Sequence, residues 1–404
     1  MVISRQNRVV VTGLGVLSSI GTGAAEFEAA LRAGREGRAQ LKAFDTTGFA
    51  HSYGCPVRDF DPARWLRRTP PDELSRAAQF AAAASRMAIT DANLTDDDLN
   101  NAHIAIGTTE GGGHELDQLT AATLANGPEH LDPNLIAKTS AAALSTAVVR
   151  ELNLATAQSS TIATACAAGN YAIGDAFDAI RYGEAEIALC GGAEAIARKT
   201  FTVFYRLGLI APDHCRPFDI ARSGILTAEG AAVLLLETFD SARRRGAKIY
   251  AEVLGYGLNC DAALPTAPTR DSVADCMRRA LADASVKKDE VDLIVAHGTG
   301  TPANDSTEAG AIRDVYGDSP PQATALKSML GHAMGAASAL GAAAAALAIA
   351  HRFVPPTINH RETDPACAID CVPNQARHAE PRIVQNNAFA FGGNNAVVIM
   401  GRHT

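Results

Sequence analysis

The chain has 404 residues, of which 47% are hydrophobic and 20% are charged, and its formal net charge is −8. This composition is typical of a soluble globular protein with two or three units or one large α/β body, and the acidic balance argues against a nucleic-acid-binding surface. The eight cysteines include no CxxC pair, so we expect reduced thiols, a cytoplasmic protein and no metal site.

Neither of the two segments that resemble membrane-targeting elements predicts a membrane protein. The N-terminal sequence MVISRQNRVVVTG lacks the apolar core of a signal peptide. Residues 331–351 are long enough to cross a bilayer, but they are mostly Ala and Gly. Because such residues gain little from contact with lipid, we expect a buried, closely packed helix there and no membrane partner.

Short apolar, β-branched runs alternate with Ala-rich segments of helical periodicity along the chain. Strands are predicted at 8–16, 101–109, 186–192, 230–237, 248–259, 291–300, 322–328 and 394–401. Helices are predicted at 24–33, 73–92, 167–182, 271–284, 306–315 and 332–351. Several strands are apolar on both faces, which suits a sheet covered by helices on each side. The Arg-rich segment 237–248 divides the chain into two α/β halves, residues 1–245 and 246–404.

The first predicted strand runs into VTGLGVLSSIG, a pattern similar to a dinucleotide-binding fingerprint. Gly13 and Gly15 fit that pattern, but Ser18 stands where the third glycine is required. We therefore interpret the segment as a tight turn that leaves the strand, and we expect no nicotinamide cofactor.

A cysteine among small residues marks the next segment of interest, STIATACAAGNYAIGDAFDAIRYG. An extended stretch precedes a helical one, so Cys166 is predicted at the start of a helix. Unpaired N–H groups there favour an anion, which predicts a lowered thiol pKa and a site for an oxyanion. A buried structural cysteine is equally compatible with this segment alone.

Two histidines and a lysine follow in the second half. His297 comes directly after a predicted strand, Lys327 lies at the end of another, and His332 heads the Ala-rich helix. Near a helix N-terminus an imidazole should stay neutral, and two neutral imidazoles could hold the enolate oxygen that forms when a malonyl thioester loses CO₂. Asp305 and Glu308 read as a helix capping box, with Asp305 as the cap.

The last motif, NNAFAFGGNN, carries Phe389 and Phe391 before consecutive glycines. These glycines allow the backbone to approach a ligand, so the Phe391 N–H could point into a site. A bulge at the strand entry is the alternative.

Taken in order, these segments resemble those of a β-ketoacyl-[acyl-carrier-protein] synthase of the type II elongating kind, over essentially the whole chain. The matching motifs are VVVTGLGVLSSIG, TACAAG, AHGTGTPANDSTE, KSMLGHAMGAA, VPPTINH and FAFGGNN. The resemblance implies a thiolase-like fold, in which two similar α/β halves form a five-layer α-β-α-β-α core, usually as a dimer. It also implies decarboxylative condensation of an acyl-cysteine with malonyl-carrier protein, which gives a 3-oxoacyl chain two carbons longer without a cofactor.

The resemblance also implies a role for each matching residue. Cys166 would be the nucleophile, and His297 and His332 would hold the malonyl thioester oxygen. The Cys166 and Phe391 N–H groups would form the oxyanion hole, with Phe391 as a gate. The other implied roles are charge control by Lys327 paired with Glu308, pantetheine contacts by Thr299 and Thr301, substrate contact by Phe389, and carrier-protein docking by Arg67, Arg68 and Arg206.

Three departures from the family pattern bear on the substrate. Glu110 stands where fatty-acid enzymes carry an apolar residue that lines the acyl pocket, and the segments 259–268 and 221–230 also differ. A carboxylate facing a saturated chain would cost several kcal/mol unless it were paired. These departures favour a specialised polyketide or polyene pathway, possibly with a chain-length-factor-like sister subunit in a heterodimer.

Two alternatives remain. A non-catalytic chain-length partner would be expected to lack the thiol, and Cys166 argues against it. A thiolase-type acyl-CoA acyltransferase would need a second cysteine near the end of the chain, whereas the late motif is FGGNN.

Overall fold

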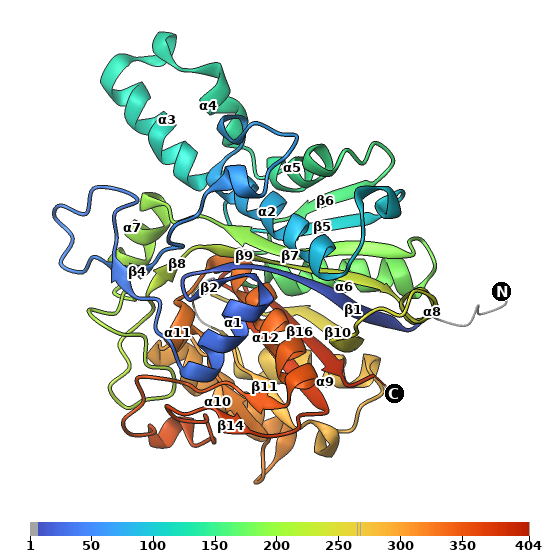
Figure 1. The fold of residues 1–404 in the computed structure, drawn as a ribbon. Helices are drawn as coiled ribbons and strands as arrows, with labels where there is room; N and C mark the ends of the chain where they lie inside the picture. Colours follow the sequence, from blue (N-terminus) through green and yellow to red (C-terminus); the bar gives the residue numbers. More distant parts are fainter. Residues whose placement is uncertain (1–6, 265, 267, 404) are drawn as a thin grey trace.

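The computed structural model describes residues 7–264, 266 and 268–403 (Figure 1). The larger strands are β1 (Val9–Ser18), β5 (His103–Gly107), β6 (Gln158–Ile162), β7 (Ile187–Glu194), β9 (Gly230–Thr238), β10 (Ala251–Cys260), β11 (Leu293–Val295), β12 (Gln322–Thr324), β15 (Ile383–Phe389) and β16 (Asn394–Gly401). Short pairs add β2 (Gly21–Thr22), β3 (Ala39–Gln40), β4 (Tyr53–Cys55), β8 (Thr227–Ala228), β13 (Phe353–Val354) and β14 (Arg377–His378).

The helices follow the same alternation. They are α1 (Gly23–Ala33), α2 (Arg76–Asp91), α3 (Gly113–Asn126), α4 (Pro133–Lys138), α5 (Ala143–Leu152), α6 (Ala168–Arg181), α7 (Arg198–Arg206), α8 (Phe239–Arg244), α9 (Arg270–Asp283), α10 (Pro302–Tyr316), α11 (Lys327–Leu330) and α12 (Ala337–His351). Two 3-10 turns matter for the site, η5 (Ala165–Ala167) before α6 and η7 (Met334–Ala336) before α12.

The strands form two half-sheets of the same topology. The orders are β1-β9-β7-β5-β6 and β10-β16-β15-β11-β12, and in both the first three strands are antiparallel neighbours while the last three are parallel. Antiparallel pairing of β1 with β10, from Val9↔Val253 to Val11↔Ala251, joins the half-sheets edge to edge. The strands of the first half-sheet all come from residues before 239, and those of the second from residues after 250.

Helices complete five layers, as the resemblance implies (Figure 1). The helices α6 and α12 lie in the middle and contact strands of both half-sheets. The helices α2 and α5 cover the outer face of the first half-sheet, and α9 and α10 lie against the second. This arrangement buries most strand faces against a helix layer, which explains why so many strands are apolar on both sides.

The segment Met334–His351 is, within the described part of the chain, the one helix long and apolar enough to cross a bilayer. It is also 83% buried inside the protein. Its alanines pack between the two half-sheets, as the sequence predicts for a buried helix.

The predicted turn at Gly13 and Gly15 is wrong, because both residues lie inside β1. A β-carbon on Gly13 would come within 2.2 Å of the Ala88 oxygen, and one on Gly15 within 1.7 Å of the Ala84 oxygen. The glycines therefore permit close contact between β1 and α2 rather than a turn.

Three predicted boundaries also shift. The helix predicted at 306 begins at Pro302 with Thr301 as its cap, so Asp305 lies inside the helix and caps nothing. Lys327 starts the short helix α11 instead of ending a strand, and His332 lies in the turn between α11 and η7.

Candidate active site

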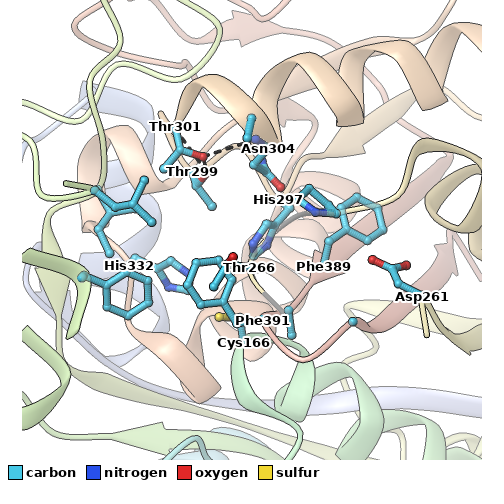
Figure 2. A pocket seen from close by; sticks show the side chains of 17 residues that line it. Cys166, Asp261, Thr266, His297, Thr299, Thr301, Asn304, His332, Phe389 and Phe391 are labelled. Carbon is cyan, nitrogen blue, oxygen red and sulfur yellow. Dashed lines mark hydrogen bonds between the residues drawn. The ribbon is translucent and has the colours of Figure 1, made fainter. Parts of the chain in front are cut away.

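One pocket brings together most of the predicted site residues (Figure 2). Cys166 comes from the first half, and His297, His332, Phe389 and Phe391 come from the second. The pocket is also lined by Phe204, Leu209, Ile225, Asp261, Thr266, Pro268, Thr299, Thr301, Ala303, Asn304, Ala390 and Gly393. Residues 265 and 267 of the divergent segment 259–268 lie outside the described residues.

Cys166 lies in η5, in the short connection from β6 to α6, as the sequence predicts. Ala165 before it has a φ of 50°, a left-handed conformation that is rare for alanine and that turns the cysteine toward the pocket. The thiol is 5% exposed, and burial raises its pKa to about 11. The predicted lowering of the pKa is therefore wrong, since loss of solvent outweighs the stabilising groups.

The groups that stabilise the thiolate are nevertheless in place. The positive charge of Lys327 and the backbone N–H groups of Phe391 and Cys166 each lower the pKa of the sulfur. Both N–H groups thus lie beside this sulfur, where they could donate to the carbonyl oxygen of an acyl group bound to it. This is the arrangement that the family resemblance implies for an oxyanion hole.

The two histidines form a matched pair beside the cysteine. Their ring centroids are 5.6 Å apart, with an interplanar angle of 83°. The Met334 N–H donates to His332 Nδ1 at 3.0 Å, so the proton of that ring is on Nε2. Lys327 Nζ lies 3.4 Å from His297 Nδ1, which places the proton of His297 on Nε2 as well.

Both imidazoles are neutral, as predicted, although the cause differs from the predicted helix dipole. Burial holds the pKa of His297 and that of His332 well below the usual value, and the positive charge of Lys327 lowers both further. A neutral imidazole can donate one hydrogen bond without contributing a full charge to the pocket.

Lys327 and Glu308 do not form the expected ion pair. The Lys327 ammonium donates to the His297 carbonyl oxygen at 2.5 Å. Glu308 instead accepts from the N–H groups of His297 at 2.8 Å and Gly298 at 2.7 Å, and from the Asn387 amide at 3.0 Å. Glu308 therefore fixes the His297 loop. Burial lowers the pKa of Lys327, and the charge of Glu308 opposes this shift only as a longer-range interaction.

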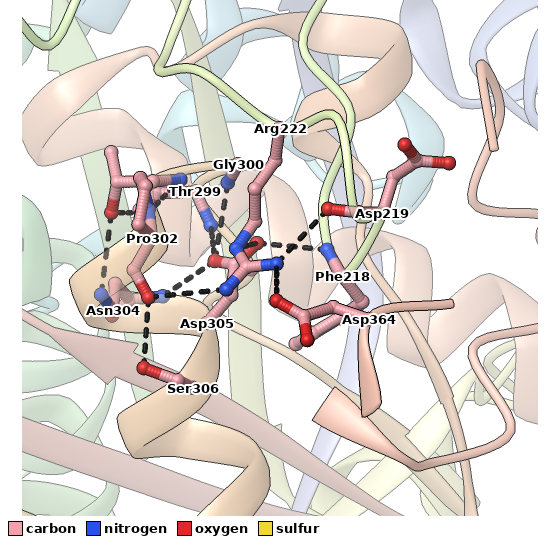
Figure 3. A network of polar contacts seen from close by, with 12 residues as sticks. Phe218, Asp219, Arg222, Thr299, Gly300, Pro302, Asn304, Asp305, Ser306 and Asp364 are labelled. Carbon is pink, nitrogen blue, oxygen red and sulfur yellow. Dashed lines mark hydrogen bonds and ion pairs between the residues drawn. The ribbon is translucent and has the colours of Figure 1, made fainter. Parts of the chain in front are cut away.

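A second buried carboxylate organises the threonine loop (Figure 3). The hydroxyls of Thr299 and Thr301 lie 2.9 Å apart at the pocket wall. Asp305 accepts from the N–H groups of Thr299 at 3.0 Å and Gly300 at 3.2 Å. It also accepts from the Phe218 N–H at 2.8 Å, which links the loop to the segment around residue 218.

Arg222 closes this network, and the sequence analysis had marked its segment as divergent without identifying the residue. Its guanidinium lies 3.9 Å from Asp305, pairs with Asp364 at 2.5 Å and donates to the Pro302 carbonyl at 3.4 Å (Figure 3). Arg222 belongs to the divergent segment 221–230, so this segment supports the loop that carries Thr299 and Thr301.

Glu110 does not line the pocket. It follows β5, and one carboxylate oxygen lies 3.2 Å from Lys199 Nζ. The other oxygen is buried and has no hydrogen-bond partner among the described residues.

The three predicted docking arginines lie outside the pocket. Arg68 pairs with Asp96 at 3.3 Å. The side chains of Arg67 and Arg206 make no hydrogen bond or ion pair within the described chain. Arg206 ends α7, whose Phe204 stacks on Phe391 with ring centroids 5.3 Å apart.

Comparisons with known proteins agree with this geometry. The family model described as "Beta-ketoacyl synthase, N-terminal domain" matches residues 6–242, and "Beta-ketoacyl synthase, C-terminal domain" matches residues 250–361. The 3-oxoacyl-[acyl-carrier-protein] synthase 2 of Synechocystis sp. (strain ATCC 27184 / PCC 6803 / Kazusa) is 38% identical and covers 98% of this chain and 99% of its own. Nodulation protein E of Rhizobium sp. (strain N33) is 36% identical over 97% of this chain and 98% of its own.

Solved structures give the same result. The structure described as "The ishigamide ketosynthase/chain length factor" matches with a TM-score of 0.98 and 57% identity over 99% of this chain and 100% of that chain. A complex described as "AntDE:AntF (apo): type II PKS acyl-carrier protein in complex with its ketosynthase bound to the hexaketide" matches with a TM-score of 0.90 and 32% identity over 99% and 100%. Because the N-terminal family model spans more than half of the chain and relatives above 30% identity span nearly all of it, the chain belongs to the β-ketoacyl synthase family and is a 3-oxoacyl-[acyl-carrier-protein] synthase, an acyl-transferring condensing enzyme.

Proposed function

We propose that this enzyme extends an acyl chain on a carrier protein with Cys166 as its nucleophile, in a pathway that makes a polyketide or polyene. The observation that carries the proposal is the shared pocket of Cys166, two neutral imidazoles and the Phe391 N–H, built from both halves of the chain (Figure 2). A condensing reaction needs a nucleophile, an oxyanion site and an enolate site within reach of one another.

The first half-reaction loads the cysteine. Cys166 Sγ attacks the thioester carbonyl carbon of the acyl-carrier, and the Cys166 and Phe391 N–H groups stabilise the oxyanion that forms. Collapse of this intermediate leaves the acyl group on Sγ and breaks the bond to the carrier's sulfur. The carrier's thiol departs with the proton that the cysteine loses.

The second half-reaction makes the carbon–carbon bond. The Nε2–H groups of His297 and His332 donate to the malonyl thioester oxygen. As the carboxyl group leaves as CO₂, its bonding electrons form the enolate. The enolate carbon attacks the acyl carbonyl, the bond to Cys166 breaks, and the thiolate takes up a proton. Burial, together with the charge of Lys327, keeps both rings neutral, so they remain donors to the enolate.

The carrier arm would enter past Thr299 and Thr301, which lie in the pocket wall beside Asn304. Arg67 and Arg206 are suited to an acidic carrier protein because no acidic side chain of the described chain neutralises them. Arg68 is less available, since Asp96 already pairs with it.

An open sheet edge is one argument that the chain binds a second subunit. The strand β6 ends the first half-sheet and pairs only with β5 among the described strands, whereas the outer edge of β12 is covered by the Asp370 carbonyl at 2.7 Å. Open edges in native proteins are usually covered or paired. The helices α3, α4 and α7 also expose apolar side chains, including Leu124, which is 84% exposed.

We infer a dimer, with a chain-length-factor-like chain as the preferred partner. The 57% identity to the structure described as a ketosynthase/chain length factor favours this partner over a second copy of the chain. It also favours a polyketide or polyene product.

Intact-protein mass spectrometry with a panel of acyl-carriers tests the function. Cys166→Ala is expected to gain no acyl mass, while His297→Ala and His332→Ala should still acylate but release CO₂ from malonyl-carrier far more slowly. Normal acylation of Cys166→Ala would refute the role of the thiol. Native mass spectrometry of the same samples distinguishes the heterodimer from the homodimer.

A further inference from the structure

One buried carboxylate beside the pocket has no part in the chemistry above. Glu194 ends β7, and the residue is 2% exposed. Among the described residues no basic side chain pairs with it. Four hydrogen bonds from protein donors hold it instead, three from backbone N–H groups and one from a hydroxyl.

These donors come from two turns that belong to opposite halves of the chain. In the first half, Glu194 accepts from the N–H groups of Thr109 at 2.6 Å and Glu110 at 3.2 Å, and from the Thr108 hydroxyl at 3.0 Å. In the second half it accepts from the Gly335 N–H at 3.0 Å. One carboxylate therefore ties the turn after β5 to η7.

The η7 turn also sets the orientation of His332. The Met334 N–H, one residue before Gly335, donates to His332 Nδ1 at 3.0 Å and so directs Nε2–H away from the turn. The two turns are in direct contact, since a β-carbon on Gly335 would lie 2.4 Å from the Thr108 Cα. A displacement of Gly335 is thus carried to the Met334 N–H and from there to the imidazole.

We propose that Glu194 is a positioning residue for His332, which fixes the η7 turn against the turn after β5 so that Nε2–H meets the malonyl oxygen. The inference rests on the proposed role of His332 in decarboxylation. Glu194 touches neither substrate nor the reacting sulfur, so it acts only through the two turns. The same carboxylate adds negative charge near Cys166, which is one cause of the raised thiol pKa.

Glu237 provides a matched control. It is also a fully buried glutamate, on the adjacent strand β9, and it accepts from the Thr12 hydroxyl at 2.5 Å and pairs with Arg245. It does not line the pocket, and it contacts neither turn. Glu237→Gln therefore reports the cost of removing a buried carboxylate that serves only the fold.

The test compares the two half-reactions in Glu194→Gln, Glu237→Gln and His332→Ala. In Glu194→Gln an amide NH₂ replaces one acceptor oxygen and faces backbone donors, so CO₂ release from malonyl-carrier is expected to fall at least about tenfold. Acylation of Cys166 should stay within about threefold of wild type. Glu237→Gln should lower the melting temperature without changing the ratio of the two rates.

The ratio of the two half-reaction rates separates positioning from simple destabilisation, because a loss of folded enzyme lowers both rates together. Equal losses in both half-reactions, or unchanged CO₂ release from folded Glu194→Gln, would overturn the inference. If Glu194→Gln does not fold, Glu194→Asp must show the same preferential loss of CO₂ release. Wild-type CO₂ release by His332→Ala would instead overturn the proposed function.

Discussion

Raising the pH from 7 to 10 should speed alkylation of Cys166 about tenfold per pH unit, because only the thiolate reacts. With a pKa of about 11, about one Cys166 thiol in three thousand is ionised at pH 7.5. Ionisation at that pH then costs about 5 kcal/mol. An unperturbed cysteine, with a pKa of about 8.5, would be about one-tenth ionised under the same conditions.

Lys327→Met tests the main opposing charge. Burial raises the pKa of Cys166, and the Lys327 ammonium is the largest cause that lowers it. Without this charge the alkylation profile should move to higher pH, with about a tenfold slower reaction at fixed pH for each unit gained by the pKa. Lys199→Met is the control, since Lys199 pairs with Glu110 outside the pocket and is 47% exposed.

The assay is alkylation by iodoacetamide, followed by peptide mass spectrometry of all eight cysteines in one digest. The exposed Cys260 reports on the reagent in the same tube. A Cys166 profile that reaches its plateau below pH 8.5 would refute the argument that burial dominates. An unchanged profile in Lys327→Met would refute the assignment of the opposing charge.

Three further predictions concern the buried histidines, the support of the threonine loop and the packing of β1 against α2. The free energy of unfolding, measured by urea denaturation, should fall as the pH drops below about 6.5, by up to about 1.4 kcal/mol per pH unit for each of His297 and His332. The reason is that both imidazoles become protonated in the unfolded chain but stay neutral in the folded one. Arg222→Met should raise KM for malonyl-carrier more than it lowers kcat in steady-state kinetics, because it loosens the support of the threonine loop. Gly15→Ala should cost at least about 2 kcal/mol by the same urea measurement, since its β-carbon would overlap the Ala84 oxygen of α2.

The strands that the sequence predicts are those whose burial is visible as apolar runs. β15 was not among them, because its sequence IVQNNAF has three amides in its centre. Those amides are buried and satisfied by partners distant in the chain: Gln385 accepts from the Tyr316 hydroxyl at 2.6 Å, and Asn386 donates to the Asn170 side chain at 2.8 Å. Such partners exist only after the halves pack, so local pattern could not show them.

The site divides in the same way. The positions of Cys166 and His297 at strand ends could be predicted, because a strand followed by small residues or a helix start is a local pattern. The direction of the thiol pKa shift could not be predicted, because the argument from the helix N-terminus does not include burial, and burial decides that direction. Glu194 and Arg222 were missed for a related reason: each is identified by the backbone groups that surround it, not by its neighbours in the chain.

The repeated topology also explains how the two halves divide the chemistry. In the first half Ala165, with φ 50°, precedes Cys166 and α6, and in the second Met334, with φ 44°, precedes Gly335 and α12. Each turn therefore sends a backbone N–H toward the region where the halves meet. At Cys166 that N–H is free to face a substrate oxygen, whereas at Gly335 Glu194 occupies it.

Position 335 cannot carry a nucleophile of its own, because the contact with Thr108 leaves no room for a β-carbon. The second turn can contribute only through residues on either side of this contact, and His332 is the one that reaches the pocket. In the proposed reaction one fold repeat supplies the nucleophile and the other the enolate donors, and the close contact at Gly335 leaves no room for a side chain at that position.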